Sequence, residues 1–462
     1  MNSRRWYYFL PLAGMAFGVW YVKSAFADVI YSDYIRLVNS YLPDVWNPEK
    51  FFVGDIFTRI PLNYLARIIN TAVFDYRIRF DQGLGILSMG LGAMLIVSYC
   101  IKKNIGVWWY LCLMAMMFSL NKWEMMINGS GWIHFFAFVG FYYHYLALER
   151  LWTGQEKKGD HGKCLWLPWV LTLAVAGPYC AIYTVTLLLV YGFKLAEGRV
   201  KERTWQRRYV CYSVSAVIPL LLYIWSNAQV AEEYHGMTDI PIMEQLGTDP
   251  GYMVRFFVKS FASMVIGKEP AENLLVGNLP YMVLGLMVIG MYILALWLQI
   301  RCRLYRETVF PMILIVSGGL NHVLIWYSRW GFLQEQYGMS SRYALQFQIG
   351  IFGIILTFAL AGRKLERDRS PALRRTVSVA AAAGLAVLVA GNVYTTLEEV
   401  KKAPARKEVC LRRQEMARNF ENLTDEDLRW NFEFRTYNPE SGKAVRNALE
   451  ILKKNKWNVF RE

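Results

Sequence analysis

Apolar residues in this sequence come in long runs that are separated by short charged segments. A helix rises about 1.5 Å per residue, so about 20 apolar residues cross a bilayer. Eleven runs approach that length, and they cover residues 6–26, 82–101, 105–120, 132–148, 165–177, 179–194, 210–228, 279–299, 308–326, 343–362 and 376–393. The pattern predicts an all-α polytopic membrane protein with about eleven transmembrane helices.

The fifth and sixth runs are short and meet at Gly177-Pro178. They form either a tight helical hairpin or one kinked span, and this choice sets the orientation of every later segment. With the hairpin, the Lys- and Arg-rich loops that follow residues 299 and 362 share a side with Arg4 and Arg5. Because short basic loops stay in the cytoplasm, we expect the hairpin, a cytoplasmic N-terminus and a C-terminus outside.

The first outer segment, residues 27–81, has the pattern of helices rather than of a plain loop. Residues 34–42 suggest a short amphipathic helix, and a longer one follows. Its apolar positions are Phe57, Ile60, Leu65, Ile68, Ile69, Ala72 and Val73, and its polar positions are Arg59, Asn63, Arg67 and Asn70. Such spacing is typical of helices that lie in the membrane interface with the polar face toward lipid headgroups.

Two further segments lie outside in this topology. Residues 229–278 contain Asp249-Pro250, which predicts the N-cap and first turn of an interfacial helix. The tail, residues 394–462, has helix starts at Thr424 and at Asn438-Pro439, and an amphipathic end. We expect a transmembrane domain over 1–393 and a helical tail over 394–462 that packs on its outer rim.

Composition agrees with a lipid environment and excludes other classes. Hydrophobic residues make up 55% of the 462 positions, and charged residues only 19%, below the roughly 25% of soluble domains. The net charge of +15 is already explained by the basic loops, so we expect no nucleic-acid partner. The seven cysteines include no CxxC pair, and no disulfide framework is indicated.

Asp28, Asp33 and Arg36 form the first candidate site, just beyond the outer end of the first run. A carboxylate in such a low-dielectric mouth can act as a general base on an acceptor hydroxyl. The alternative is that both aspartates are solvated loop charges.

The second candidate is the segment Ser340-Ser341-Arg342-Tyr343, which opens the tenth run from outside. The N–H groups at a helix start suit an anion, and the planar fork of Arg342 matches phosphate oxygens. Alternatively, Arg342 reaches lipid headgroups and the serines are an ordinary cap.

Other polar residues are weaker candidates. Arg59 and Arg67 either contact a phosphate or face headgroups, and Lys122 and Glu124 either line the same cavity or form an exposed ion pair in a turn. Single histidines on apolar helices, His134, His144 and His322, lack the paired spacing of metal ligands. No metal site or cofactor is indicated, although a divalent cation is possible.

With an acid in Ile30-Tyr31-Ser32-Asp33-Tyr34 and a later outer Arg342, the chain resembles the GT-C superfamily of membrane glycosyltransferases. The resemblance implies a polyprenyl-phosphate sugar donor, inversion at the sugar carbon, Asp33 as the essential acidic residue with Asp28 as second choice, and Arg342 near the donor phosphate. The chain departs from the family by showing no Asp-x-Asp or Asp-Glu pair in the first loop, which leaves metal dependence open.

The expected function is therefore transfer of a sugar to a lipid-linked or cell-surface glycan, in polysaccharide biosynthesis of the cell envelope. The end of the tail, residues 449–460, resembles those of bacterial membrane proteins, which implies a bacterial plasma membrane. A flippase or transporter of polyprenyl-linked glycans, or a non-catalytic assembly protein, stays open. Sparse ionisable residues at the span centres argue against a transporter.

Overall fold

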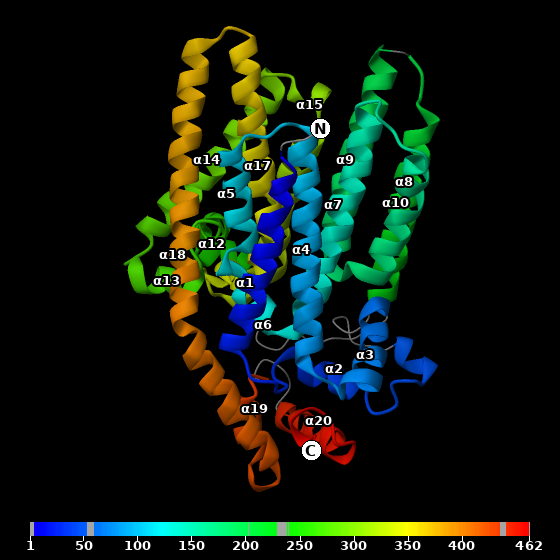
Figure 1. The fold of residues 1–462 in the computed structure, drawn as a ribbon, viewed down its shortest axis with the longest axis vertical. Coiled ribbons are helices and arrows are strands. Elements are labelled where there is room, and N and C mark those ends of the chain that lie inside the picture. Colours follow the sequence, from blue (N-terminus) through cyan, green and yellow to red (C-terminus); the bar gives the residue numbers. More distant parts are fainter. Residues whose placement is uncertain are drawn as a thin grey trace.

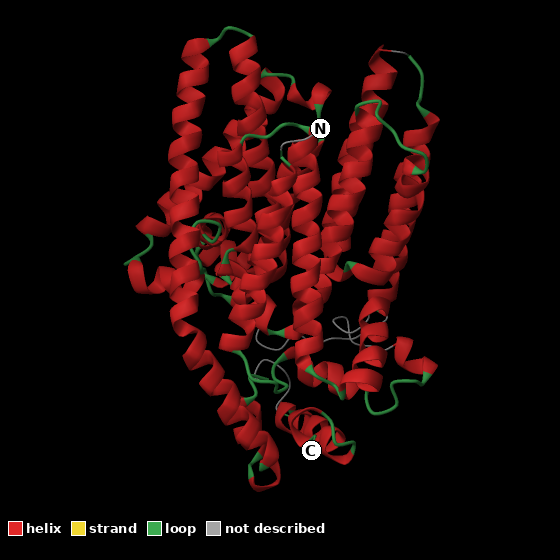
Figure 2. Ribbon diagram, in the orientation of Figure 1, coloured by secondary structure: helices red, strands yellow, loops and turns green. Residues whose placement is uncertain are grey.

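The computed structural model describes residues 4–52, 60–201, 203–228, 238, 240–434 and 440–461, without the side chains of 51 and 52. These residues form helices and loops, with no strand among them (Figure 2). Phe57, Arg59 and the expected helix start at Asn438-Pro439 lie outside the described residues.

A helix occupies each of the eleven apolar runs. They are α1 (Phe9–Ala25), α4 (Ile78–Lys102), α5 (Val107–Phe118), α7 (Trp132–Trp152), α8 (Asp160–Val170), α9 (Cys180–Lys201), α10 (Arg207–Ala228), α14 (Leu279–Arg301), α16 (Phe310–Arg329), α17 (Ser341–Arg367) and α18 (Pro371–Arg418). Seven helical stretches in the described chain are long and apolar enough to cross a bilayer, and α9, α10, α14, α16, α17 and α18 are among them, together with α4. The protein is therefore a helical membrane protein.

The chain reverses at Gly177-Pro178. Pro168 inside α8 is followed by a π-helical turn, Leu171–Val175, and then by Gly177 at φ 51°, a conformation that glycine adopts without strain. Trp169 Nε1 donates to Ser215 Oγ at 3.0 Å, and His161 lies against Tyr212. These contacts place α8 and α10 side by side and in the same direction. Since α9 connects them, it runs in the opposite direction and is a separate helix from α8.

A close helix crossing joins α16 to α17. A Cβ placed on Gly318 would lie 2.3 Å from the Cα of Gly350, and a Cβ on Gly350 would overlap the Tyr292 side chain, so both positions require glycine. Small residues at such crossings are typical of helices in membranes, where close packing replaces the hydrophobic effect. This crossing packs α17, whose first turn carries Arg342, against α16.

The two ends of the helical bundle differ (Figure 1). The N-terminus and the loop between α17 and α18 lie at one end, and the C-terminus lies at the other. The second end also holds the short helices of the first segment and of the tail: α2 (Asp33–Tyr41), α3 (Pro61–Phe74), α19 (Asp425–Asn431) and α20 (Ser441–Lys454).

A second hydrophobic core lies at this end. It combines residues of 26–45 with the buried faces of α18, α19 and α20, including Ile35, Val38, Leu428 and Leu449. The tail therefore packs against the first segment instead of forming a core of its own. Thr424 caps α19 in a capping box, as the sequence predicted.

Along the chain, four short helices lie between the long helices of the bundle. They are α6 (Trp123–Ile127), α11 (Ile242–Thr248), α12 (Pro250–Ala262) and α13 (Lys268–Leu274), and α15 (Leu304–Glu307) adds one turn before α16. Asp249 accepts a hydrogen bond from the Tyr252 N–H at 3.1 Å, so the predicted cap of α12 is confirmed.

The polar face of α3 points the opposite way from the prediction. Asn63, Arg67 and Asn70 are buried, whereas Leu65, Ile69 and Val73 are exposed. The Arg67 guanidinium binds Asp81, at the start of α4, and Tyr34 donates to the same carboxylate. The expected contact of Arg67 with headgroups is therefore wrong, because a fully buried guanidinium needs a buried carboxylate beside it.

Candidate functional site

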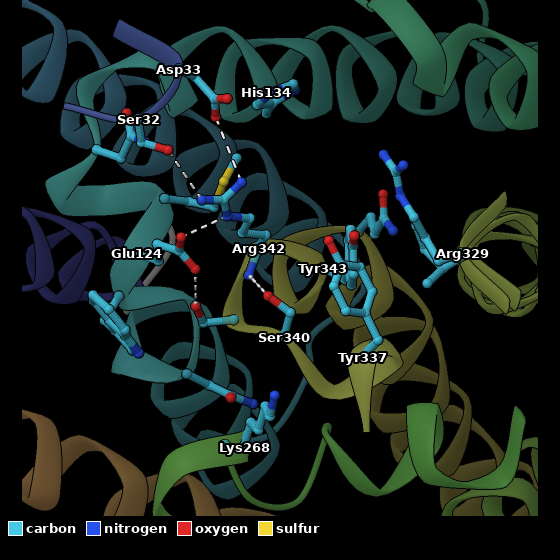
Figure 3. Close-up of a pocket in the computed structure, with 18 of the residues that line it drawn as sticks. Ser32, Asp33, Glu124, His134, Lys268, Arg329, Tyr337, Ser340, Arg342 and Tyr343 are labelled. Atoms are coloured by element: carbon cyan, nitrogen blue, oxygen red, sulfur yellow. Dashed lines mark hydrogen bonds and ion pairs between the residues drawn. The ribbon is translucent and has the colours of Figure 1, made fainter. Parts of the chain in front are cut away.

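A cavity of about 980 Å³ opens where the bundle meets the short helices of the C-terminal end. Its walls come from the first residues of α2 and α17, from α6, α7, α13 and α18, and from the loop that follows α16. Segments more than three hundred residues apart in the sequence thus contribute to one site, and its lining is rich in charged side chains (Figure 3).

Arg342 lies at the centre of this lining. Ser340 caps α17 by accepting the Arg342 N–H at 3.4 Å, so Arg342 lies in the first turn of the helix. Its Nε donates to Glu124 Oε1 at 2.6 Å, and Ser341 Oγ donates to Glu124 Oε2 at 3.0 Å. Both oxygens of Glu124 are therefore occupied, and the arginine is held firmly on one side.

The other side of the guanidinium faces the first segment. Arg342 Nη1 is 3.7 Å from Asp33 Oδ2, and Nη2 donates to Ser32 Oγ at 3.5 Å. These contacts are longer than that to Glu124 and correspondingly weaker. Asp33 keeps 24% of its side chain exposed and Arg342 39%, so both groups are accessible from the cavity.

Asp33 follows a constrained residue. Ser32 has φ 51° and ψ −129°, a backbone conformation like that of the second position of a type II′ turn, which favours glycine. The Tyr34 N–H closes the turn on the Tyr31 carbonyl at 3.1 Å. A non-glycine residue in this region costs of order 1–3 kcal/mol and persists only where its surroundings enforce it.

Several cavity residues were not singled out by the sequence. Arg329 and Lys268 bring two more cations to the lining, and His134 lies beside Asp33 in Figure 3. His134 stands edge-on to Tyr179 with ring centroids 5.1 Å apart. The apolar runs around Arg329 and His134 gave no sign of a shared cavity, because only the fold brings α7 and α16 to one wall.

One wall is a cluster of paired charges on α18. Glu399, which is fully buried, accepts from Arg406 Nη2 at 2.7 Å, and the same nitrogen reaches Glu269 Oε2 at 2.8 Å. The Arg406 guanidinium also lies 3.3 Å from the centroid of the Trp123 ring. This cluster joins α18 to α6 and α13 and so closes the cavity on that side.

The remaining sequence candidates divide between the cavity and the scaffold. Tyr343, Ser341 and Glu124 line the cavity with Asp33 and Arg342. Asp28, Arg36 and Lys122 are described residues that do not line it, and Arg59 lies outside the described residues.

Asp28 has a structural environment. Its Oδ1 accepts the Ile78 N–H at 2.9 Å and the Asn458 side chain at 3.4 Å. Burial raises the pKa of this carboxyl, and the Ile78 hydrogen bond opposes that shift. Asp28 thus connects the first segment, the start of α4 and the end of the tail.

Lys122 is fully buried behind the cavity. Its ammonium donates to Gln348 Oε1 at 2.7 Å and to the carbonyls of Ser119 at 3.1 Å and Met116 at 3.4 Å. Burial without an anionic partner lowers the pKa of Lys122 from 10.5 to about 7. Neither alternative holds for Lys122: it does not line the cavity, and it forms no exposed ion pair with Glu124, which binds Arg342 instead.

No group of three or more His, Cys, Asp or Glu side chains suited to hold a metal ion occurs within the described ranges. Comparisons of the chain with protein-family models, with curated proteins and with solved structures find nothing that matches. The roles of the cavity residues therefore follow from their chemistry and placement.

Proposed function

We propose that the protein is an integral-membrane glycosyltransferase of GT-C type that moves a sugar from a polyprenyl-phosphate donor to a lipid-linked or cell-surface glycan. The observation that carries the proposal is the meeting of Asp33 with Arg342 in one large cavity. A potential base and a potential phosphate ligand, both partly exposed, are what a phosphate-linked sugar and a hydroxyl acceptor require.

The proposed step is an inverting displacement. The acceptor hydroxyl attacks the anomeric carbon while Asp33 takes its proton, and the bond from that carbon to the phosphate oxygen breaks. The departing polyprenyl phosphate carries the new negative charge. Arg342, at the positive end of the α17 dipole, is placed to stabilise that charge.

The other cations of the cavity support this assignment. Arg342 already faces the carboxylates of Glu124 and Asp33, so a bound phosphate benefits from additional positive charge. Arg329 and Lys268 lie in the same lining, and Tyr343 and Tyr337 stand between Arg329 and Arg342 (Figure 3). Aromatic rings beside polar groups are suited to a sugar, whose two faces are apolar and whose edges are polar.

For topology we propose eleven spans in a bacterial plasma membrane, with the N-terminus and basic loops cytoplasmic. The proposal extends the seven apolar stretches to α1, α5, α7 and α8, which occupy the other apolar runs. The cavity then opens at the outer face. There the exposed stripe of α3, formed by Leu65, Ile69 and Val73, contacts the lipid boundary.

Replacing Asp33 by Asn tests the chemistry directly. The amide preserves shape but accepts no proton, so transfer falls by about 1,000-fold, while thermal stability stays at the wild-type value. The measurement is transfer in vitro from a panel of polyprenyl-phosphate sugars to purified glycolipid acceptors. Asp44→Asn, at an exposed position of the same segment, is the matched control and retains activity.

Undiminished transfer by Asp33→Asn would refute Asp33 as the base, whereas absence of transfer by the wild-type protein would refute the proposed function and favour transport or assembly of polyprenyl-linked glycans. Reconstituted vesicles distinguish these two outcomes, because only a transporter moves a fluorescent polyprenyl-linked glycan across the bilayer.

A further inference from the structure

The tail lies directly against the segment that carries Asp33. Gln414 Nε2 donates to the Asp28 carbonyl at 3.0 Å, and Asn458 Nδ2 reaches the Tyr76 carbonyl at 3.0 Å. Farther along α2, Asn39 Nδ2 donates to the Ala444 carbonyl at 2.9 Å. The tail therefore holds the first segment at three separate places, besides sharing its hydrophobic core.

One contact reaches the residue next to Asp33. The Ser32 N–H donates to the Phe432 carbonyl at 2.8 Å, while the Ser32 hydroxyl accepts from Arg342. Ser32 is thus held between the tail and α17. These two contacts enforce the strained turn from which α2 starts and so set the direction of Asp33.

Arg413 of α18 braces the short turn that presents the Phe432 carbonyl. Its Nε donates to the Asn431 carbonyl at 2.7 Å, and its Nη2 binds the Glu433 carboxylate. The guanidinium also lies 4.9 Å from the centroid of the Tyr31 ring. Only 8% of Arg413 is exposed, and Glu433 itself lines the cavity.

We propose that Arg413 is a positioning residue for the site. Through the turn 431–433 it fixes the Phe432 carbonyl, which holds Ser32 and thereby Asp33 opposite Arg342. The tail is then part of the reactive centre rather than an appendage, and Glu433 lines the cavity together with Thr395 and Glu399 of the same tail. The effect on catalysis rests on the proposed function, whereas the effect on the Ser32 turn does not.

Arg446 provides a matched control on the same tail. It also braces backbone carbonyls, those of Phe420 at 3.2 Å and Leu423 at 2.6 Å, and it pairs with Asp425. All of these partners belong to the tail. Lysine at position 413 or 446 keeps the charge but loses the planar fork, so both variants loosen the tail and only Arg413→Lys loosens Ser32.

The test is hydrogen exchange of the purified full chain in lipid nanodiscs, followed by mass spectrometry. We expect peptides covering residues 28–35 to exchange at least about ten-fold faster in Arg413→Lys, because the Ser32 N–H loses its fixed acceptor. The same peptides in Arg446→Lys keep wild-type exchange. Wild-type protection in Arg413→Lys, or equal loss in both variants, would overturn the proposal.

Kinetics add a second measurement once transfer is established. Arg413→Lys lowers kcat by about ten- to hundred-fold through misplacement of Asp33 and leaves the KM for the donor within a factor of about three. A wild-type protein without transfer activity would refute the proposed function alone, since the exchange experiment still decides the role of Arg413. A raised KM with unchanged kcat would refute positioning of Asp33.

Discussion

Glu149 and Asp33 are two carboxylates near opposite ends of the bundle, and their surroundings differ in nearly every respect. Glu149 is 2% exposed. It accepts from the Thr308 hydroxyl at 2.8 Å and from the Val309 and Phe310 N–H groups at 2.8 and 3.1 Å, and Lys103 lies 2.8 Å away. Asp33 is partly exposed and has a 3.7 Å contact with Arg342.

The difference separates a structural charge from a reactive one. Glu149 caps the start of α16 and has every oxygen occupied, so a substrate proton finds no free lone pair there. Asp33 borders a cavity of about 980 Å³ and lacks a short partner on its Oδ2. A base must keep such an open position for the hydroxyl that it deprotonates.

The largest expected effect concerns Glu149. Replacement by Ala leaves Lys103 and two helix-start N–H groups without their partner, which costs about 3–5 kcal/mol of stability. Thermal unfolding in detergent measures the loss, and transfer per folded molecule stays near the wild-type value. Glu156→Ala, at an exposed glutamate paired with His161, is the control. Equal melting temperatures for the two variants would remove the distinction drawn between Glu149 and Asp33.

A smaller effect is expected at Arg342. Lysine at this position keeps one positive charge but cannot contact Glu124 and face Asp33 at the same time. Transfer therefore falls by about 100-fold in kcat/KM, with little change in stability, since the side chain is partly exposed. Steady-state kinetics with the donor varied measures the loss. Wild-type kcat/KM in Arg342→Lys would show that the fork geometry plays no part.

An effect that is small at each pH step sharpens the comparison with a second buried charge. Lys122 has only neutral acceptors and a pKa near 7, against 10.5 in the unfolded chain. Between these values the unfolded state binds more protons, so stability rises with pH by up to about 1.4 kcal/mol per unit and levels off outside this window. Unfolding measured from pH 6 to 10 shows this rise, and Lys122→Met abolishes it. A flat wild-type profile would contradict the burial of a titrating ammonium.

The sequence predicted the positions of the helices better than it predicted which side chains contact one another. The run 82–101 became Ile78–Lys102 and the run 343–362 became Ser341–Arg367, because long apolar stretches leave a helix as the only way to satisfy the backbone in lipid. The run 376–393 underestimated α18, which continues to Arg418. Beyond residue 393 the helix depends on Glu, Lys, Ala and Arg, which favour helices without an apolar pattern.

The directions in which polar side chains point, and the charged groups that they pair with, were harder to predict. The polar stripe of α3 suggested that Arg67 faces headgroups. Its actual partner, Asp81, lies in the next helix, and no periodic pattern in the sequence links the two. Asp33 and Arg342 were placed at the same mouth by topology alone, and they do meet. The sequence offered Lys122 as a partner for Glu124, whereas the contact that forms, with Arg342, spans 218 positions of sequence. Such contacts depend on tertiary packing that no local pattern encodes.

The length of α18 has a mechanical consequence. A straight helix of its 48 residues would be about 72 Å long at 1.5 Å per residue, more than twice the roughly 30 Å of hydrocarbon in a bilayer; α18 bends in its C-terminal part (Figure 1), which contains Pro404. A rotation of about 5° about its middle displaces each end by about 3 Å, which is the length of a hydrogen bond. Arg413 lies near the C-terminal end of α18, beyond the apolar run. A change in the tilt of α18 would therefore reach the turn 431–433 that Arg413 braces.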